Sequence, residues 1–259
     1  MEKLIKTNLQ DDGIMFIGFN RPPVNALSLD FIDELTNIFR EIENNKKCRI
    51  VIINSLMSNF CAGADLKERK IMSLEGADNA LDKLNECFNL IENCRIPTIA
   101  AINGYCLGGG AELSLCCDFR ILEESSIIGF PEVGIGIIPG AGGTQRLSRL
   151  TNKSTAKYWI YSARKFTAEE ALEDHVADFL ANDGELLETA IELGEEILQN
   201  APLSIEASKK AIDRGLECKD MKTALNIERE HYKVTLKSED RIEALNAFSE
   251  KRKAHWKGK

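Results

Sequence analysis

Residues 102–112 read Ile102-Asn103-Gly104-Tyr105-Cys106-Leu107-Gly108-Gly109-Gly110-Ala111-Glu112. An apolar run of the kind that forms a buried strand passes through Asn-Gly into three consecutive glycines, and a carboxylate follows two residues later. Because glycine loses more chain entropy on folding than any other residue, three in a row indicate a close approach of backbone. Either tight packing or a ligand that contacts backbone N–H groups would explain them.

A second glycine-rich stretch repeats the theme. Residues 129–144 also carry a single glutamate, Glu132, and ten of the 18 glycines of the chain fall between Gly104 and Gly143. This concentration locates a candidate site before any chemistry is assigned to it.

Outward from this stretch, hydrophobic periodicity predicts the order strand, strand, helix, which then repeats. Continuous apolar runs are typical of parallel strands buried on both faces, whereas apolar residues spaced by three and four predict helices. From about residue 185 the pattern is wholly helical. We therefore expect an α/β fold with a core over residues 1–200 and an all-helical region over 201–259. The predicted strands are 3–9, 14–19, 49–54 and 97–102, and the predicted helices begin after Ser28, run through 81–91, cover 185–199, open at Pro202, and span 221–236 and 238–251.

Composition narrows the class of protein. The chain has 259 residues, is 44% hydrophobic and carries a formal net charge of −8, which argues against nucleic acid as its main partner. We find no apolar run that would cross a bilayer and no signal-peptide pattern, so we expect a cytoplasmic protein without a membrane partner. Eight cysteines without a Cys-x-x-Cys pair predict reduced thiols in the core, and three histidines leave little for a metal site. The basic end, 251–259, predicts a solvated terminus, with a phosphate contact as the alternative.

Three motifs point to a family. Residues 60–68 (Phe-Cys-Ala-Gly-Ala-Asp-Leu-Lys-Glu), 102–113 and 138–147 (Ile-Pro-Gly-Ala-Gly-Gly-Thr-Gln-Arg-Leu) together resemble the enoyl-CoA hydratase (crotonase) family. The resemblance extends from Asn20 to Arg252, nearly the whole chain. Within the family, the first motif and Tyr-Ser-Ala-Arg at 161–164 are most similar to the methylglutaconyl-CoA hydratase branch, some of whose members also bind RNA.

The resemblance implies a superhelix of strand-strand-helix turns, followed by a helical C-terminal region that forms homotrimers, which often pair into hexamers. It also implies an acyl thioester of coenzyme A as substrate, no separate cofactor, and two backbone N–H donors at Ala64 and Gly109. Tyr232 and Lys251 would reach the coenzyme from a neighbouring subunit. The full set of positions that match the family's substrate and coenzyme contacts is Val24, Ala26, Ala62, Asp65, Leu66, Lys67, Gly140, Tyr232 and Lys251.

The implied reaction explains why N–H donors belong at those two positions. Adding water to an α,β-unsaturated thioester moves negative charge to the thioester oxygen, where preorganised N–H groups stabilise it. Gly109 is also expected to begin a helix that runs through Cys117, where unpaired N–H groups and the helix dipole favour an anion. A role in packing alone would explain the glycines but not the paired glutamates.

Glu112 and Glu132 are the candidate catalytic carboxylates. The helical face of Glu112 carries glycines, Leu115 and Cys116, which makes it an inward, apolar face. Taken alone, Glu132 after Pro131 fits the first turn of a helix. The resemblance implies instead that the two glutamates hold one water: one accepts its proton, and the other, protonated, delivers a proton to the α-carbon. Two close carboxylates in an apolar pocket cannot both ionise readily, so one pKa should rise.

Three functions stay open on the sequence. The first is enoyl-CoA hydration, the second is another reaction of the family such as double-bond isomerisation, and the third is a non-enzymatic RNA-binding role. Family members that only move a double bond can work with one carboxylate, so the pair favours hydration. Three nearby residues have secondary roles. Asp118 either orients Glu112 or simply ends its helix. Phe130 is a candidate to reshape the acyl pocket, and Gly143 is expected to serve helix entry and packing.

Overall fold

The structure, a computed structural model, describes residues 3–259. It divides into two compact units, the first made of Met1–Cys94 and Thr98–Glu192 and the second of Arg95–Pro97 and Leu193–Lys259. Both glycine-rich stretches belong to the first unit. The division into domains at residue 200 stays a prediction.

The first unit contains a six-stranded sheet with the order β1-β2-β3-β4-β6-β9. Its first two strands form an antiparallel hairpin, whose turn is closed by the Asp12 carboxylate accepting a hydrogen bond from Ile14 N–H. All later pairings in this sheet are parallel. The strands are β1 (Ile5–Leu9), β2 (Ile14–Phe19), β3 (Ile50–Ser55), β4 (Thr98–Ile102), β6 (Phe119–Glu123) and β9 (Phe179–Ala181). The fully buried β4 matches the continuous apolar run that predicted it.

A smaller sheet explains how the chain winds. It has the order β5-β7-β8, with β5 (Tyr105–Leu107), β7 (Ile127–Gly129) and β8 (Lys165–Thr167). β5 follows β4 and β7 follows β6, while β4 pairs with β6 and β5 pairs with β7, in both cases parallel. Each turn of the chain therefore adds one strand to each sheet before a helical segment returns it. The predicted α/β class and its strand-strand-helix order are confirmed.

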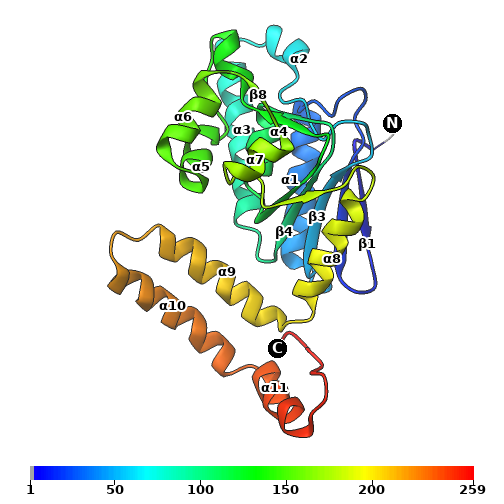
Figure 1. The fold of residues 1–259 in the computed structure, drawn as a ribbon, viewed down its shortest axis with the longest axis vertical. Coiled ribbons are helices and arrows are strands. Elements are labelled where there is room, and N and C mark those ends of the chain that lie inside the picture. Colours follow the sequence, from blue (N-terminus) through cyan, green and yellow to red (C-terminus); the bar gives the residue numbers. More distant parts are fainter. Residues whose placement is uncertain (1–2) are drawn as a thin grey trace. The chain divides into compact units, whose positions relative to one another are not determined.

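Helices of the first unit begin where the sequence predicts a cap. The Ser28 hydroxyl accepts a hydrogen bond from Phe31 N–H and so begins α1 (Leu29–Asn44). Helix α1 lies beside α3 (Leu74–Glu92), and each buries an apolar stripe (Figure 1). The shorter helices are α2 (Leu66–Lys70), α4 (Gly109–Ser114), the 3-10 helix η1 (Pro131–Ile135), α5 (Gly143–Leu150), α6 (Lys153–Tyr161) and α7 (Ala168–Glu173).

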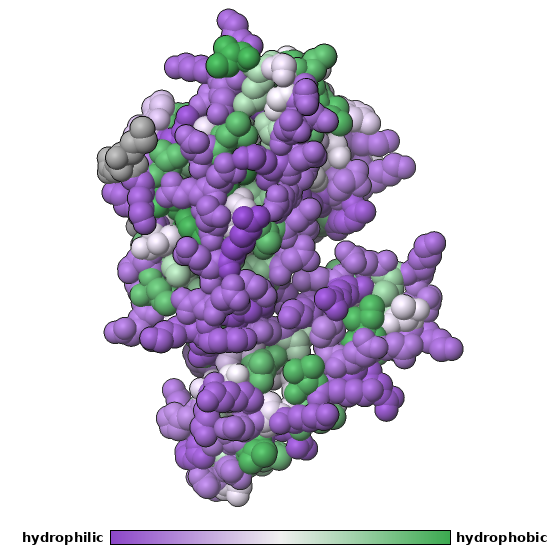
Figure 2. Space-filling view, turned by 180° about the vertical axis from the view of Figure 1, so that it is seen from behind, coloured by the Kyte–Doolittle hydropathy of each residue, from purple (hydrophilic) through white to green (hydrophobic). Residues whose placement is uncertain are grey.

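The C-terminal helices follow the predicted spans closely. They are α8 (Leu186–Leu198), α9 (Pro202–Leu216), α10 (Met221–Leu236) and α11 (Glu239–Glu250), with α9 and α10 packed side by side (Figure 1). Many apolar side chains on α9 to α11 are exposed, and they form patches on the surface of this region (Figure 2). The most exposed are Leu216 and Phe248, at 83% and 86%.

The C-terminal tail, 251–259, contains no buried residue, in line with the expected solvated terminus, but it is also held by specific hydrogen bonds. The buried carboxylate of Asp240 accepts hydrogen bonds from the backbone N–H groups of Lys257 and Gly258, at 2.7 and 3.0 Å. The Trp256 indole donates to the Gln199 carbonyl at 2.6 Å. Backbone donors of the tail, the Trp256 indole and ion pairs of Arg252 with Glu243 and Glu250 therefore hold the tail against the helices of the second unit.

Two composition-based expectations bear on the core and on membranes. Seven of the eight cysteines are buried, as expected for thiols that pack within a core. Over residues 3–259, no helix is both long enough and apolar enough to cross a bilayer.

Candidate active site

The site is formed by three chain segments, which follow Cys61, β5 and β7. Cys61 and Cys106 form an isolated parallel bridge, and Leu107 pairs with Gly129 in the parallel register of β5 and β7. Gly108 N–H then donates to the Gly129 carbonyl at 2.9 Å. Because the bridge and the β5–β7 pairing are both parallel, the residues that follow, 62–65, 108–112 and 130–132, emerge side by side.

Two glycines of the first stretch serve packing. A Cβ atom at Gly104 would lie 2.1 Å from the Ser58 carbonyl oxygen, and one at Gly110 would lie 2.4 Å from the Cys61 carbonyl oxygen. A side chain at Gly104 or Gly110 would therefore push the 58–61 segment away from the start of β5 or from α4. The packing explanation holds for these two glycines.

Ala64 and Gly109 present backbone N–H groups to the same space. Leu27 donates to the Gly63 carbonyl and accepts from Asp65 N–H, so the N–H of the intervening Ala64 points to the opposite side. A Cβ atom at Gly109 would lie 3.7 Å from the Ala64 nitrogen, and one at Gly63 would lie 3.3 Å from the Gly109 nitrogen. Within residues 3–259, neither of these two N–H groups donates a hydrogen bond to another residue.

The 24–27 segment lies along the 62–65 segment, which brings together the predicted contacts Val24, Ala26 and Ala62. Ala62 N–H donates to the Val24 carbonyl at 3.0 Å. Beneath them, the fully buried Asn25 has a φ of 52°, and its amide nitrogen donates to the Ser55 hydroxyl and to two carbonyls of the 59–60 segment. One buried amide thus fixes both segments.

Asp65 holds this arrangement in place through its side chain. The carboxylate accepts hydrogen bonds from Lys67 and Glu68 N–H at the start of α2 and forms an ion pair of 2.6 Å with Arg21. The Arg21 guanidinium beside it lowers the pKa of Asp65. Leu66 and Lys67 are exposed on α2 next to this site. The predicted contacts of these three residues with the coenzyme stay predictions.

Glu112 lies on α4 and is only 3% exposed. Its Oε1 accepts hydrogen bonds from Ala141 N–H and Gly143 N–H, both at 2.8 Å. The pKa of Glu112 is raised to about 7: burial and the nearby Glu132 raise it, while the two N–H donors and Arg146 act to lower it. The carboxyl group therefore changes its charge close to neutral pH.

Glu132 belongs to η1, directly after the strand end that Gly108 contacts. A Cβ atom at Gly108 would lie 2.9 Å from Glu132 Oε1, so this carboxyl reaches the backbone at the start of α4. Its Oε2 is buried, and no residue in the described chain forms a hydrogen bond with it. Burial raises the pKa of Glu132 as well. Glu132 does lie in the first turn of a helix, as the sequence alone favoured, but it is buried there and its pKa is raised, so a simple helix-start charge does not describe it.

The residues that hold Glu112 were missed from the sequence. Gly143 was expected to serve packing, yet its N–H binds the Glu112 carboxylate, and a Cβ atom there would lie 3.0 Å from Oε1 and 2.8 Å from Pro139 Cβ. The available signal was a Pro-Gly-Ala-Gly-Gly run before a helix, which presents unpaired N–H groups. Gly140 lies in the same run, is exposed, and faces Leu81 on α3, where a Cβ atom would meet a methyl carbon at 3.2 Å.

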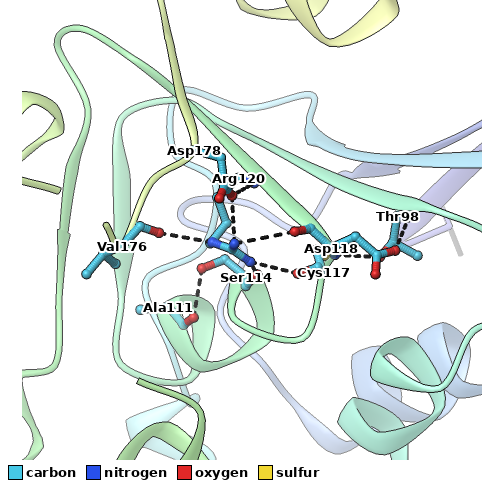
Figure 3. A network of polar contacts seen from close by, with 8 residues as sticks. All are labelled: Thr98, Ala111, Ser114, Cys117, Asp118, Arg120, Val176 and Asp178. Carbon is cyan, nitrogen blue, oxygen red and sulfur yellow. Dashed lines mark hydrogen bonds and ion pairs between the residues drawn. The ribbon is translucent and has the colours of Figure 1, made fainter. Parts of the chain in front are cut away.

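A buried arginine closes the C-terminal end of α4 (Figure 3). The Arg120 guanidinium donates to the carbonyls of Ser114, Cys117 and Val176, at 3.4, 2.7 and 3.0 Å, and forms an ion pair of 2.6 Å with Asp178. A cation at this helix end stabilises carbonyls that have no partner within the helix. It therefore helps to fix the helix that carries one of the two glutamates.

Two expectations about α4 need correction. The helix ends at Ser114, short of the predicted Cys117, so the two specific N–H groups matter more than any long dipole. Asp118 accepts hydrogen bonds from the N–H and hydroxyl of Thr98, at 2.8 and 3.1 Å, and ties the start of β6 to the start of β4 (Figure 3). It thus serves the sheet and lies beyond the end of α4.

Phe130 is fully buried directly before Pro131 and Glu132. Its ring lies 6.4 Å from that of Trp159, which stacks on Phe166 at 3.9 Å. The residue thus anchors η1 to an aromatic cluster, and its predicted influence on the acyl pocket stays a prediction. The predicted coenzyme contacts Tyr232 and Lys251 belong to the second unit, and their role also stays a prediction.

Comparison with known proteins agrees with this geometry. The sequence matches the family model of enoyl-CoA hydratase/isomerase over residues 10–259. It is 43% identical over 258 residues to the Arabidopsis thaliana protein named "Probable enoyl-CoA hydratase 2, mitochondrial", a match covering 99% of this chain and 85% of that protein. It is 40% identical over 255 residues to "Methylglutaconyl-CoA hydratase, mitochondrial" of Homo sapiens, covering 96% and 75%.

The fold also matches a solved structure over its full length. The crystal structure of an enoyl-CoA hydratase from Bacillus anthracis superposes with a TM-score of 0.96 at 41% identity, covering 99% of this chain and 100% of that one. The methylglutaconyl-CoA hydratase is thus no more similar than the two other hydratases, and it does not set one branch of the family apart.

Proposed function

The chain belongs to the enoyl-CoA hydratase/isomerase family, and from that premise we propose how its site works. The protein is an enoyl-CoA hydratase: it adds water across the α,β double bond of an acyl-CoA thioester and forms a 3-hydroxyacyl-CoA. The observation that carries the mechanism is that two buried glutamates lie close to two backbone N–H groups that have no acceptor among residues 3–259.

We assign the two N–H groups of Ala64 and Gly109 to the thioester oxygen. Attack of water on the β-carbon moves charge onto this oxygen, and donors already in place need no reorganisation at that moment. An isolated bridge and a strand fix them, because Ala64 bridges to Leu27 and Gly109 lies shortly after β5. Removal of one such donor in other enzymes raises the barrier by about 3–4 kcal/mol.

Glu112 is proposed as the base. Its carboxylate accepts two N–H hydrogen bonds, which favour the ionised form, and its pKa of about 7 leaves a substantial ionised fraction at neutral pH. In hydration this carboxylate takes a proton from the water as the water oxygen bonds to the β-carbon.

Glu132 is proposed as the acid. Its buried Oε2 has no partner among the described residues, and a protonated carboxyl group costs less there than an ionised one. It delivers its proton to the α-carbon as the enolate collapses. Because Glu132 raises the pKa of Glu112, the two groups titrate as a coupled pair.

The coenzyme portion is proposed to lie along residues 24–26 and 62–67, which run side by side in the structure. Lys67, exposed on α2, is the proposed phosphate contact, and coenzyme A enters as part of the substrate, so no separate cofactor is required. Gly140 is proposed to lie near the attacking water.

We further propose a homotrimer, or a hexamer of two trimers, assembled through the C-terminal helices. Exposed apolar side chains on α10 and α11, such as Val234, Leu245 and Phe248, support this proposal. In such an assembly Tyr232 and Lys251 would contribute to a neighbour's coenzyme site. The cytoplasm is the proposed location, although both named eukaryotic relatives are mitochondrial.

Product analysis tests the proposed reaction. The enzyme is incubated with crotonyl-CoA in ¹⁸O-labelled water, and mass spectrometry should find one labelled oxygen in the 3-hydroxybutyryl-CoA formed. A 3-enoyl-CoA substrate, offered in parallel, tests isomerisation. Fast conversion of the 3-enoyl-CoA without hydration of crotonyl-CoA would reject the hydratase in favour of an isomerase. Rates on hexenoyl-, decenoyl- and 3-methylglutaconyl-CoA would then define the acyl preference.

A further inference from the structure

Arg146 lies behind the loop that holds Glu112, and the mechanism above does not use it. It belongs to the first turn of α5, and its side chain is 12% exposed. Its Nη1 donates to the Ala141 carbonyl at 2.9 Å. Its Nε and Nη2 donate to the two carboxylate oxygens of Glu92 on α3, at 3.0 and 2.7 Å, and Nη2 also donates to Asn89 Oδ1 at 2.9 Å. The guanidinium therefore joins one backbone carbonyl to one helix.

The backbone of the loop is shaped around this guanidinium. Gly142 has a φ of 102°, and a Cβ atom there would lie 2.0 Å from Arg146 Nη1. Gly142 also caps α5, because its carbonyl accepts hydrogen bonds from Gln145 and Arg146 N–H. Both the left-handed conformation and the contact with the guanidinium require a glycine at this position.

Ala141 connects the arginine to the carboxylate. Its carbonyl accepts from Arg146, while its N–H donates to Glu112 Oε1 at 2.8 Å. Helix α3 provides the fixed end of this chain of contacts, since it spans 19 residues and buries an apolar stripe. A bidentate ion pair such as that with Glu92 has a defined geometry that a single point charge does not have.

We propose that Arg146 is a positioning residue for hydration, which anchors the 139–143 loop to α3 and so keeps the two N–H groups aimed at Glu112. The inference rests on the proposed role of Glu112 as the base. The residue does not touch the reacting atoms. Its effect on the reaction passes through Ala141 and Gly143.

The charges around Glu112 predict the direction of the effect on its pKa. Glu132 from η1 raises the pKa of Glu112, whereas Arg146 from α5 and the N–H donors of Ala141 and Gly143 lower it. The other titratable groups close by are the Cys116 thiol and Glu92, both within the electrostatic reach of Arg146. Loss of the guanidinium removes a cation and loosens two donors, so all of its consequences raise the pKa of Glu112.

The test compares Arg146→Gln and Arg146→Lys with Arg149→Gln, a control on the same helix. Arg149 is exposed and donates only to Gln145 among the described residues. In Arg146→Gln we expect kcat for crotonyl-CoA to fall about 10- to 100-fold, with little change in KM, since a small misplacement behind a catalytic group can cost about 100-fold. The acid limb of its pH–rate profile should move to higher pH.

The other variants separate charge from geometry. Arg146→Lys keeps the cation but cannot join the Ala141 carbonyl to both oxygens of Glu92. The acid limb of its pH–rate profile should therefore lie close to that of the wild type, while its kcat stays reduced. Arg149→Gln should behave as the wild type. If Arg146→Gln fails to fold, Glu92→Gln replaces it in the test, because it leaves Arg146 in place and weakens its anchor. Its kcat for crotonyl-CoA should fall, by less than the fall expected for Arg146→Gln.

Specific outcomes would overturn the inference. One is a folded Arg146→Gln enzyme, judged by circular dichroism and melting temperature, with wild-type kcat and pH profile. Another is an equal loss of activity in Arg149→Gln. A further one, where Arg146→Gln does not fold, is an unchanged kcat in Glu92→Gln. The proposed mechanism is judged separately: a fully active Glu112→Gln would reject the base itself, whereas an inactive Glu112→Gln beside a normal Arg146→Gln rejects only the positioning role.

Discussion

Gly143→Ala adds one methyl group to the loop that holds Glu112, and its effect can be estimated from the structure. The new Cβ atom would lie 2.8 Å from Pro139 Cβ and 3.0 Å from Glu112 Oε1. Both distances are shorter than van der Waals contact, and neither the proline ring nor the buried carboxylate can easily move away. The loop must shift, and the 2.8 Å hydrogen bond from Gly143 N–H to Oε1 lengthens or breaks.

A hydrogen bond to a charged group contributes about 1.5–3 kcal/mol, which corresponds to a pKa change of about one to two units. The bond favours the ionised carboxylate, so its loss raises the pKa of Glu112 above about 7. At pH 7 the ionised fraction then falls, and kcat/KM for crotonyl-CoA should fall about 5- to 50-fold. Activity should partly return at higher pH, because the carboxylate ionises there.

The assay is the pH dependence of kcat/KM, measured from the loss of enoyl-thioester absorbance. Gly134→Ala is a matched control, because it adds the same methyl group near Glu132 at a site where the nearest atom is Ala163 Cβ at 3.4 Å. It should leave the profile unchanged. A folded Gly143→Ala enzyme with wild-type kcat/KM and an unmoved acid limb would refute the reasoning.

Three further outcomes follow from the same geometry. Glu112→Gln should raise the free energy of unfolding at pH 8 by up to about 3 kcal/mol. The raised pKa of Glu112 means that the wild-type protein loses stability as the pH rises from about 4.5 to 7, and glutamine does not ionise. Equal melting temperatures of variant and wild type at pH 8 would contradict this. Gly109→Val should abolish turnover in a folded protein, because its side chain fills the space beside the Ala64 nitrogen, 3.7 Å from the Cβ position; near-normal turnover would remove Gly109 from the oxyanion site. Light scattering should find trimers or hexamers, and Phe248→Glu, at a position 86% exposed, should shift them toward monomers; a monomeric wild type at micromolar concentration would reject the proposed assembly.

Much of the fold could be predicted because its signals are local. The apolar run of β4 and the Ser28 cap of α1 each depend on a few consecutive residues, and both are where the pattern places them. The inward direction of Glu112 also followed from helical spacing, since its neighbours at three and four residues are glycines and apolar side chains. The family resemblance then supplied the pairing with Glu132.

What the sequence missed depends on contacts between distant segments. No residue near Gly143 in the sequence indicates that its N–H binds a carboxylate 31 residues away. In the same way, nothing local in the sequence shows that Gly104 lies close to the Ser58 carbonyl, whereas Gly109 lies beside the Ala64 nitrogen. The tail was expected in solvent from its charge, and its residues are largely exposed, but the hydrogen bonds from its backbone to Asp240 could not be predicted from the charge count.

The initial rate of crotonyl-CoA hydration by Glu112→Gln and by Glu132→Gln, each beside the wild type at pH 7, tests the central claim most directly. Each substitution keeps the size of the side chain and removes one proton-transfer group, so each rate should fall by about 10²- to 10⁴-fold. Binding of coenzyme A, measured by calorimetry, should barely change, since the predicted coenzyme segment lies at 24–26 and 62–67. A folded variant of either glutamate that hydrates crotonyl-CoA at the wild-type rate would contradict the two-carboxylate mechanism.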